Sequence, residues 1–179
     1  MQMELEVKKA QHGDKEAFIR LFRSIELELY GLAKSIVKRD EDCADVFQET
    51  TLKAYKALIT LKEPKFFKTW VIRILINECN QLLRKQELTV ADPQEVSYLP
   101  PRYFENYDKV DLQGAVDHLD ASLRVVITLF YYQDMPIKQI SSVLDISEGA
   151  VKTRLHRARG ILAEWYQYSL ERKMICEPI

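Results

Sequence analysis

Apolar residues recur at intervals of three and four along most of this chain, and no segment alternates apolar and polar residues for long. Phe18, Leu21, Phe22 and Ile25 begin the first such series, which continues to Ile36. Intervals of three and four place side chains on one face of a helix, whereas a strand needs a period of two. The sequence therefore predicts an all-α protein.

Prolines divide this helical pattern into two halves. Pro93, Pro100 and Pro101 lie in an acidic stretch, from about residue 91 to 107, that lacks sustained helical spacing. We therefore predict an N-terminal domain over residues 1–88, a flexible linker over 89–109 and a C-terminal domain over 110–179.

Breakers and capping residues set the expected helix bounds. Asp14 can cap the first helix, Asp40 or Asp42 can begin the second, and Pro64 ends it. The other expected helices span residues 66–85, 112–119, 122–132, 137–144 and 148 to about 170. The expected inward residues are Phe47, Thr51, Ala54 and Leu58 in the second helix and Trp70, Ile74, Asn77 and Leu82 in the third.

Composition excludes several classes of protein. With 47% hydrophobic and 30% charged residues, the chain can bury a core and stay soluble. No apolar run reaches the roughly 18 residues that a membrane span needs, and residues 1–11 are charged, so we expect a cytoplasmic protein. Cys43, Cys79 and Cys176 lack metal-site spacing and are expected to be reduced structural thiols.

Charge is segmented along the chain, although the net charge is only -1. An acidic stretch over residues 40–49 precedes a basic one over 62–85, and acid returns over 87–120. Basic residues then dominate the last helical segment, where Lys152, Arg154, Arg157 and Arg159 have no acidic residue among them. Two basic zones predict two contacts with nucleic acid.

Residues 137–162 have the spacing of a helix-turn-helix. Asp145 and Ile146 form a tight connection, and Ser147 can cap the second helix. Val151, Leu155, Ala158 and Leu162 fall within one arc that must face the core. The opposite side is small, polar and basic, so it can enter a major groove. A solvated basic helix is the alternative. The candidate DNA contacts are Ser147, Glu148, Lys152, Thr153, His156 and Arg157.

The run "LDASLRVVITLFYYQDMPIKQISSVLDISEGAVKTRLHRARGIL" resembles the promoter -35 binding domain of bacterial sigma factors, in particular the extracytoplasmic-function group. The segments "DVFQETTLKAYKAL" and "FFKTWVIRILINECNQLLRK" resemble the core-polymerase-binding helix and the -10 element-binding helix of the same family. Asp120, Ser141, Asp145 and Gln81 depart from the residues that the family often has. The resemblance implies a transcription initiation factor that selects promoters and helps to melt DNA.

The second predicted helix carries a polar arc opposite its expected core face, and Leu52 lies within it. An apolar anchor with a charged rim is typical of a partner interface, although a solvated face with one stray leucine has the same pattern. The resemblance favours docking on the clamp-helix coiled coil of the largest polymerase subunit. The candidate residues are Asp45, Gln48, Glu49, Leu52 and Lys56.

Basic and aromatic residues alternate just before the third predicted helix, a composition that suits unpaired DNA because rings stack on bases while lysines neutralise phosphates. Polar residues of the following helix offer donors and acceptors, and the resemblance implies recognition of the melted -10 strand here. Phe66 and Trp70 are more typical of core aromatics than of stacking platforms. The candidate residues are Lys65, Phe67, Lys68, Asn77, Asn80, Gln81 and Arg84.

No constellation for catalysis is found: the sequence has no glycine-rich phosphate loop, no metal-ligand spacing, and three histidines in unrelated segments. We expect no enzymatic activity and no cofactor. The expected partners are core RNA polymerase, promoter DNA and, as the resemblance implies, an anti-sigma factor. The alternatives are a stand-alone helix-turn-helix regulator that dimerises on duplex DNA and a helical adaptor that binds only protein.

Overall fold

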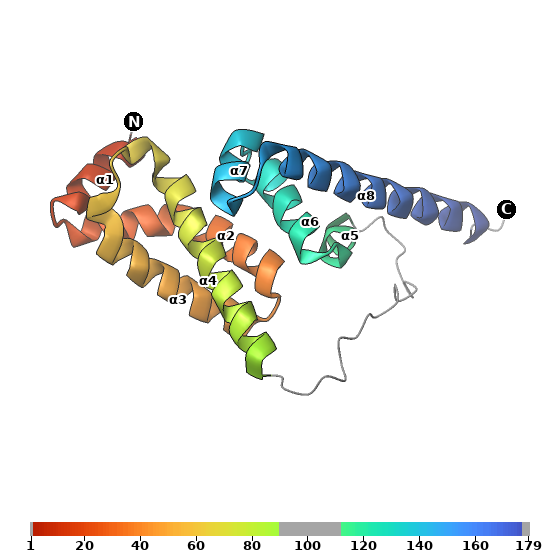
Figure 1. Cartoon of the computed structure of the whole chain (residues 1–179), viewed down its shortest axis with the longest axis horizontal. Coiled ribbons are helices and arrows are strands. Elements are labelled where there is room, and N and C mark those ends of the chain that lie inside the picture. The colour runs from red at the N-terminus through yellow and green to blue at the C-terminus, as the bar shows by residue number, and fades with distance from the viewer. Residues whose placement is uncertain (1, 90–111, 177–179) are drawn as a thin grey trace.

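The structure is a computed structural model that describes residues 2–89 and 112–176 (Figure 1). Every element in these two ranges is helical, which confirms the predicted all-α class. The predicted linker lies outside the described residues, except for residue 89. No helix in the described ranges is both long enough and apolar enough to cross a membrane.

The N-terminal half contains four α-helices and two short 3-10 helices. These are α1 (Gln2–Gln11), α2 (Lys15–Val37), α3 (Asp40–Ala57), η1 (Leu58–Thr60), η2 (Pro64–Phe66) and α4 (Phe67–Thr89). Asp14 caps α2 as predicted, because its Oδ1 accepts a hydrogen bond from the backbone N–H of Ala17 at 3.0 Å. Helix α2 packs against α1, α3 and α4 and supplies more of the core of this half than any other helix does.

Helix α1 was not expected, since the sequence analysis considered residues 1–11 only as a charged segment. It packs along α2, buries Val7 completely and pairs Glu6 with Arg20 at 2.6 Å. The side-chain amide of Gln11 donates to the carbonyls of Leu58 at 3.0 Å and Leu61 at 2.8 Å. These bonds fix the segment from Leu58 to Leu61, which precedes η2.

The predicted core face of α3 was partly wrong. Phe47 and Thr51 are only half-buried, whereas Ala54 and Leu58 lie in the core. The positions of α3 with no more than 3% exposure are Cys43, Val46, Thr50 and Ala54. The buried arc is rotated by about one residue because α3 packs against both α2 and α4, and not against one neighbour.

The predicted inward face of α4 needs a similar correction. Asn77 is exposed, and Trp70, Ile74 and Leu82 are half-buried at the edge of the core. The buried residues are Phe67, Val71, Ile72, Leu75, Ile76, Glu78 and Cys79. Helix α4 contacts α2, α3 and α7, so it is covered on more sides than a surface helix. The spacing of its apolar residues alone therefore does not define the inward face.

The C-terminal half contains α5 (Leu112–His118), α6 (Ala121–Ile127), a π-helical segment η3 (Thr128–Tyr132), α7 (Ile137–Leu144) and α8 (Glu148–Cys176). The single helix predicted over residues 122–132 therefore changes type at Thr128. The backbone N–H of Gln133 bonds to the carbonyl of Thr128 at 3.2 Å, a wider spacing than an α-helix has. Helix α8 packs against α5, α6 and α7 and extends far beyond them (Figure 1).

The two halves pack together, with α6 against α2 and α7 against α4. Arg124 of α6 is 2% exposed and lies at this contact. Its guanidinium donates to the carbonyl of Ser35 in α2 and to the carbonyls of Asp117 at 2.7 Å and Leu119 at 2.8 Å. Burial lowers the pKa of Arg124, and these backbone acceptors compensate part of the desolvation of its charge.

Candidate functional site

The turn between α7 and α8 has the geometry of a helix-turn-helix. Asp145 adopts the left-handed conformation, with φ 54° and ψ 46°, which aspartate tolerates better than most residues. The Ser141 hydroxyl donates to the carbonyl of Ile146 at 2.7 Å, which closes the turn. Ser147 Oγ then accepts from the N–H of Ala150 at 3.1 Å, so the predicted cap of α8 is confirmed.

The orientation of α8 agrees with the sequence pattern. Val151, Leu155 and Ala158 are at most 2% exposed, and Leu162 packs against the core. The opposite side of α8 holds the recognition face, whose members are all exposed: Ser147, Glu148, Lys152, Thr153, His156 and Arg157. The long basic side chains of this face can therefore reach bases and phosphates.

Thr153 and Arg159 are already engaged within the C-terminal half. The Thr153 hydroxyl donates to the carbonyl of Gly149 at 2.9 Å. Arg159 donates through Nε to the Tyr131 hydroxyl at 2.8 Å, and its guanidinium lies 5.5 Å from the Phe130 ring. Arg157, in contrast, has no hydrogen-bond or ion-pair partner among the residues that the structure describes.

On α3, the five candidate residues form one exposed docking face: Asp45, Gln48, Glu49, Leu52 and Lys56. Leu52 is 45% exposed, so an apolar side chain is available at the centre of a polar rim. Tyr55, three positions after Leu52 on α3, is also exposed. Its ring packs edge-on against the Phe18 ring, with 5.0 Å between the ring centroids. The sequence analysis missed Tyr55 because it considered only the polar arc around Leu52.

Six of the seven candidate residues for the -10 strand are at least partly exposed and form the strand face: Lys65, Lys68, Asn77, Asn80, Gln81 and Arg84. Asn77, Asn80, Gln81 and Arg84 of α4 are separated by three or four positions across the turns of the helix and so lie on one side of it. Lys68 forms an ion pair with Glu28 of α2, a partner that the sequence did not indicate. A phosphate at Lys68 would compete with this carboxylate.

Phe67, the seventh candidate, was wrongly placed on the strand face. It is fully buried, and its ring packs 6.2 Å from Phe22 and 6.3 Å from Trp70, measured between centroids. A ring without exposed surface cannot stack on a base. The neighbouring Phe66 is 45% exposed, with the Lys65 ammonium 5.0 Å from its ring centroid. Phe66 therefore has the position that the sequence analysis assigned to Phe67.

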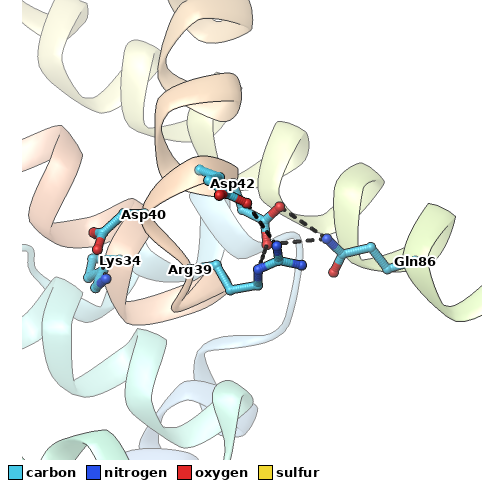
Figure 2. Close-up of polar contacts among 6 residues, drawn as sticks. Lys34, Arg39, Asp40, Asp42 and Gln86 are labelled. Carbon is cyan, nitrogen blue, oxygen red and sulfur yellow. Dashed lines mark hydrogen bonds and ion pairs between the residues drawn. The ribbon is translucent and has the colours of Figure 1, made fainter.

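Polar contacts fix α3 against α4 at two levels. Near the start of α3, the Gln86 side chain of α4 donates to both carboxylate oxygens of Asp42 at 3.2 Å, and Arg39 lies 4.0 Å from the same carboxylate (Figure 2). Further along, Lys53 of α3 donates to Glu78 of α4 at 2.7 Å. The docking face and the strand face are therefore carried on two helices that are directly linked.

These features define a helical DNA-binding protein with one helix-turn-helix and a second, separate polar surface. A model of sigma-70 region 2 matches residues 21–89, and a model of sigma-70 region 4 matches residues 109–162. The chain therefore belongs to the sigma-70 family, in its extracytoplasmic-function group, and directs transcription initiation.

Similar proteins agree with this assignment. The chain is 29% identical over 151 residues to the RNA polymerase sigma factor SigV of Bacillus subtilis, an alignment that covers 84% of this chain and 91% of the relative. It is also 29% identical over 157 residues to the extracytoplasmic-function sigma factor SigM of Mycobacterium tuberculosis, an alignment that covers 87% of this chain and 80% of the relative.

Solved structures show the same fold. The sigma factor RpoE of Bartonella quintana, solved in complex with the anti-sigma factor NepR, matches with a TM-score of 0.65 and 25% identity over 81% of this chain and 95% of that chain. CnrH, solved in complex with the cytosolic domain of CnrY, shares the fold with a TM-score of 0.66 and 24% identity over 93% of this chain and 97% of that one.

Proposed function

We propose that this sigma factor uses three separate faces: the recognition face for the -35 element, the strand face for the melted -10 strand and the docking face for core polymerase. The observation that carries the proposal is the orientation of α8. Its apolar arc is buried against α6 and α7, so Lys152, His156 and Arg157 extend outward where a major groove can receive them. The N-terminal domain, residues 1–88, would then supply the other two faces.

Run-off transcription with purified core polymerase tests this function. We expect specific initiation only when the chain is added, because the chain supplies promoter choice and the polymerase supplies the chemistry. No effect on transcription, together with tight binding to duplex DNA, would instead favour a stand-alone helix-turn-helix regulator. The polar docking face around Leu52 favours the sigma-factor function over that alternative, because a dimeric regulator needs a self-complementary interface.

The strand face is suited to capture bases after the duplex opens. Phe66 offers an exposed ring, Lys65 and Lys68 offer positive charge, and Asn80 and Gln81 offer donors and acceptors. Stacking on a ring together with neutralisation of phosphates stabilises unpaired DNA. Melting would then be driven by binding energy and would require no hydrolysis of a nucleotide by this chain.

Arg157 and Arg159 are expected to behave differently on mutation. We expect Arg157→Ala to weaken binding to the -35 element by about 1–3 kcal/mol, because the Arg157 side chain is free to reach base edges. The size of this loss should depend on which base pair stands at particular positions of the element. Arg159→Ala should have little positional effect, since Arg159 is bound to Tyr131. Binding to a series of mutated -35 elements at several salt concentrations measures both effects. An equal, position-independent loss in the two variants would contradict this orientation of α8.

We further propose that an anti-sigma factor regulates this chain. We also propose that this chain acts in the cytoplasm, where core polymerase is found. Support for the first point comes from RpoE of Bartonella quintana, which was solved with its anti-sigma factor. We also propose that the chain has no enzymatic activity of its own, since the sequence contains no catalytic constellation.

A further inference from the structure

The docking face and the strand face meet in one polar cleft between α3 and α4. The cleft has a volume of about 360 Å3. Asp45, Gln48 and Glu49 of the docking face line it from α3, and Gln81 of the strand face lines it from α4. A polymerase bound to the docking face would therefore cover one wall of a cleft whose other wall carries Gln81, a residue proposed to contact DNA.

Lys53 lies between these two walls. Its ammonium is 2.7 Å from the Glu78 carboxylate on α4 and 3.7 Å from the Glu49 carboxylate on α3. The Glu78 side chain is 8% exposed, whereas that of Glu49 is 49% exposed. The hydrogen bond with Glu78 raises the pKa of Lys53, so the lysine carries its charge at neutral pH. One ammonium thus contacts a buried carboxylate of the DNA-reading helix and an exposed carboxylate of the docking face.

Because the Glu78 carboxylate is buried, its contact with Lys53 is important for α4. A carboxylate with little access to water needs a paired cation, and Lys53 provides it for Glu78. Glu78 lies one helical turn before Gln81 and is adjacent to Asn77, so its position helps to set how these two residues are presented. When a partner covers Glu49 and Lys53, water leaves the cleft, and attraction between the charges strengthens as the effective dielectric falls.

We propose that Lys53 is a positioning residue that couples polymerase docking to recognition of the -10 strand. It does so by holding Glu78 of α4 while it contacts Glu49, a residue of the docking face. This inference rests on the functions proposed above for the two faces. Coupling between binding sites is reciprocal, so the -10 strand must tighten the binding of core polymerase by the same factor by which polymerase tightens the strand.

The test measures the dissociation constant of the full chain for core polymerase with and without a saturating -10 single-stranded oligonucleotide, selected beforehand with the wild-type holoenzyme. The ratio of the two constants is the coupling factor. We expect a coupling factor of roughly ten or more for the wild type and of less than about three for Lys53→Met and Glu78→Gln. Polymerase affinity without DNA should remain within about threefold of wild type in both variants. Lys53→Arg should retain the coupling, because it keeps the charge.

Gln86→Met is the matched control, because it removes the contact of α4 with Asp42 outside the cleft and should leave the coupling factor unchanged. Wild-type coupling in both Lys53→Met and Glu78→Gln would overturn the proposal. An equal loss in Gln86→Met would also overturn it, since general loosening of the α3–α4 contact would then be sufficient. Failure of the wild-type chain to bind core polymerase would overturn the function proposed for the docking face, and this inference with it.

Discussion

Leu52→Asp is expected to reduce the affinity for core polymerase by roughly thirtyfold or more, which corresponds to about 2 kcal/mol. The substitution places a charge where an exposed apolar anchor lies within a polar rim. Asp45→Ala and Gln48→Ala, at the rim, should have milder effects. Titration of labelled core polymerase with each variant measures the change in affinity.

Leu5→Asp is the matched control for this experiment. Leu5 is a 55% exposed leucine on α1, so the same charge is introduced at an exposed position of another helix. Both variants should keep the helical circular dichroism and thermal midpoint of the wild type, because neither side chain is in the core. Unchanged polymerase binding by folded Leu52→Asp would show that Leu52 does not contribute to the interface.

Phe67→Ala is expected to lower the free energy of unfolding by about 3–5 kcal/mol, as truncation of a buried aromatic residue typically does. The Phe67 ring is fully enclosed between Phe22 and Trp70, so its removal leaves a cavity at the start of α4. Chemical denaturation monitored by circular dichroism measures the change. A loss below about 1 kcal/mol would mean that the site can repack around the smaller side chain.

Phe66→Ala provides the comparison at the adjacent position. The exposed Phe66 ring contributes little to the core, so the stability of this variant should be near that of the wild type. Transcription from duplex promoters should fall, while transcription from templates already melted at the -10 element should fall much less. Equal losses on both templates would assign Phe66 to strand affinity alone and not to melting.

Local chemistry made much of the fold predictable. The caps at Asp14 and Ser147 and the left-handed turn at Asp145 depend on residues within a few positions of one another, and the structure contains all three. The orientation of α8 was also predictable, because this helix presents one clear apolar arc to the C-terminal core. These features need no knowledge of distant segments.

Features that depend on distant segments were less predictable. Helices α3 and α4 each contact several neighbours, so their buried faces differ from those that the spacing of apolar residues suggests. Phe66 and Phe67 are adjacent aromatics of the same type, and only the direction in which α4 begins decides which one is buried. The pairing of Lys68 with Glu28 joins residues 40 positions apart in the sequence and has no local signal.

Helix α1 has a practical consequence for dividing this chain into fragments. The sigma-70 region 2 match begins at residue 21, yet Gln11 supplies two hydrogen bonds to the corner at Leu58 and Leu61, and Val7 is completely enclosed. A fragment trimmed to residue 21 would leave two carbonyls without these donors and would remove the buried residues Val7, Ala17 and Phe18. The smallest autonomous folding unit of the N-terminal half therefore begins ahead of the segment that the region 2 model matches.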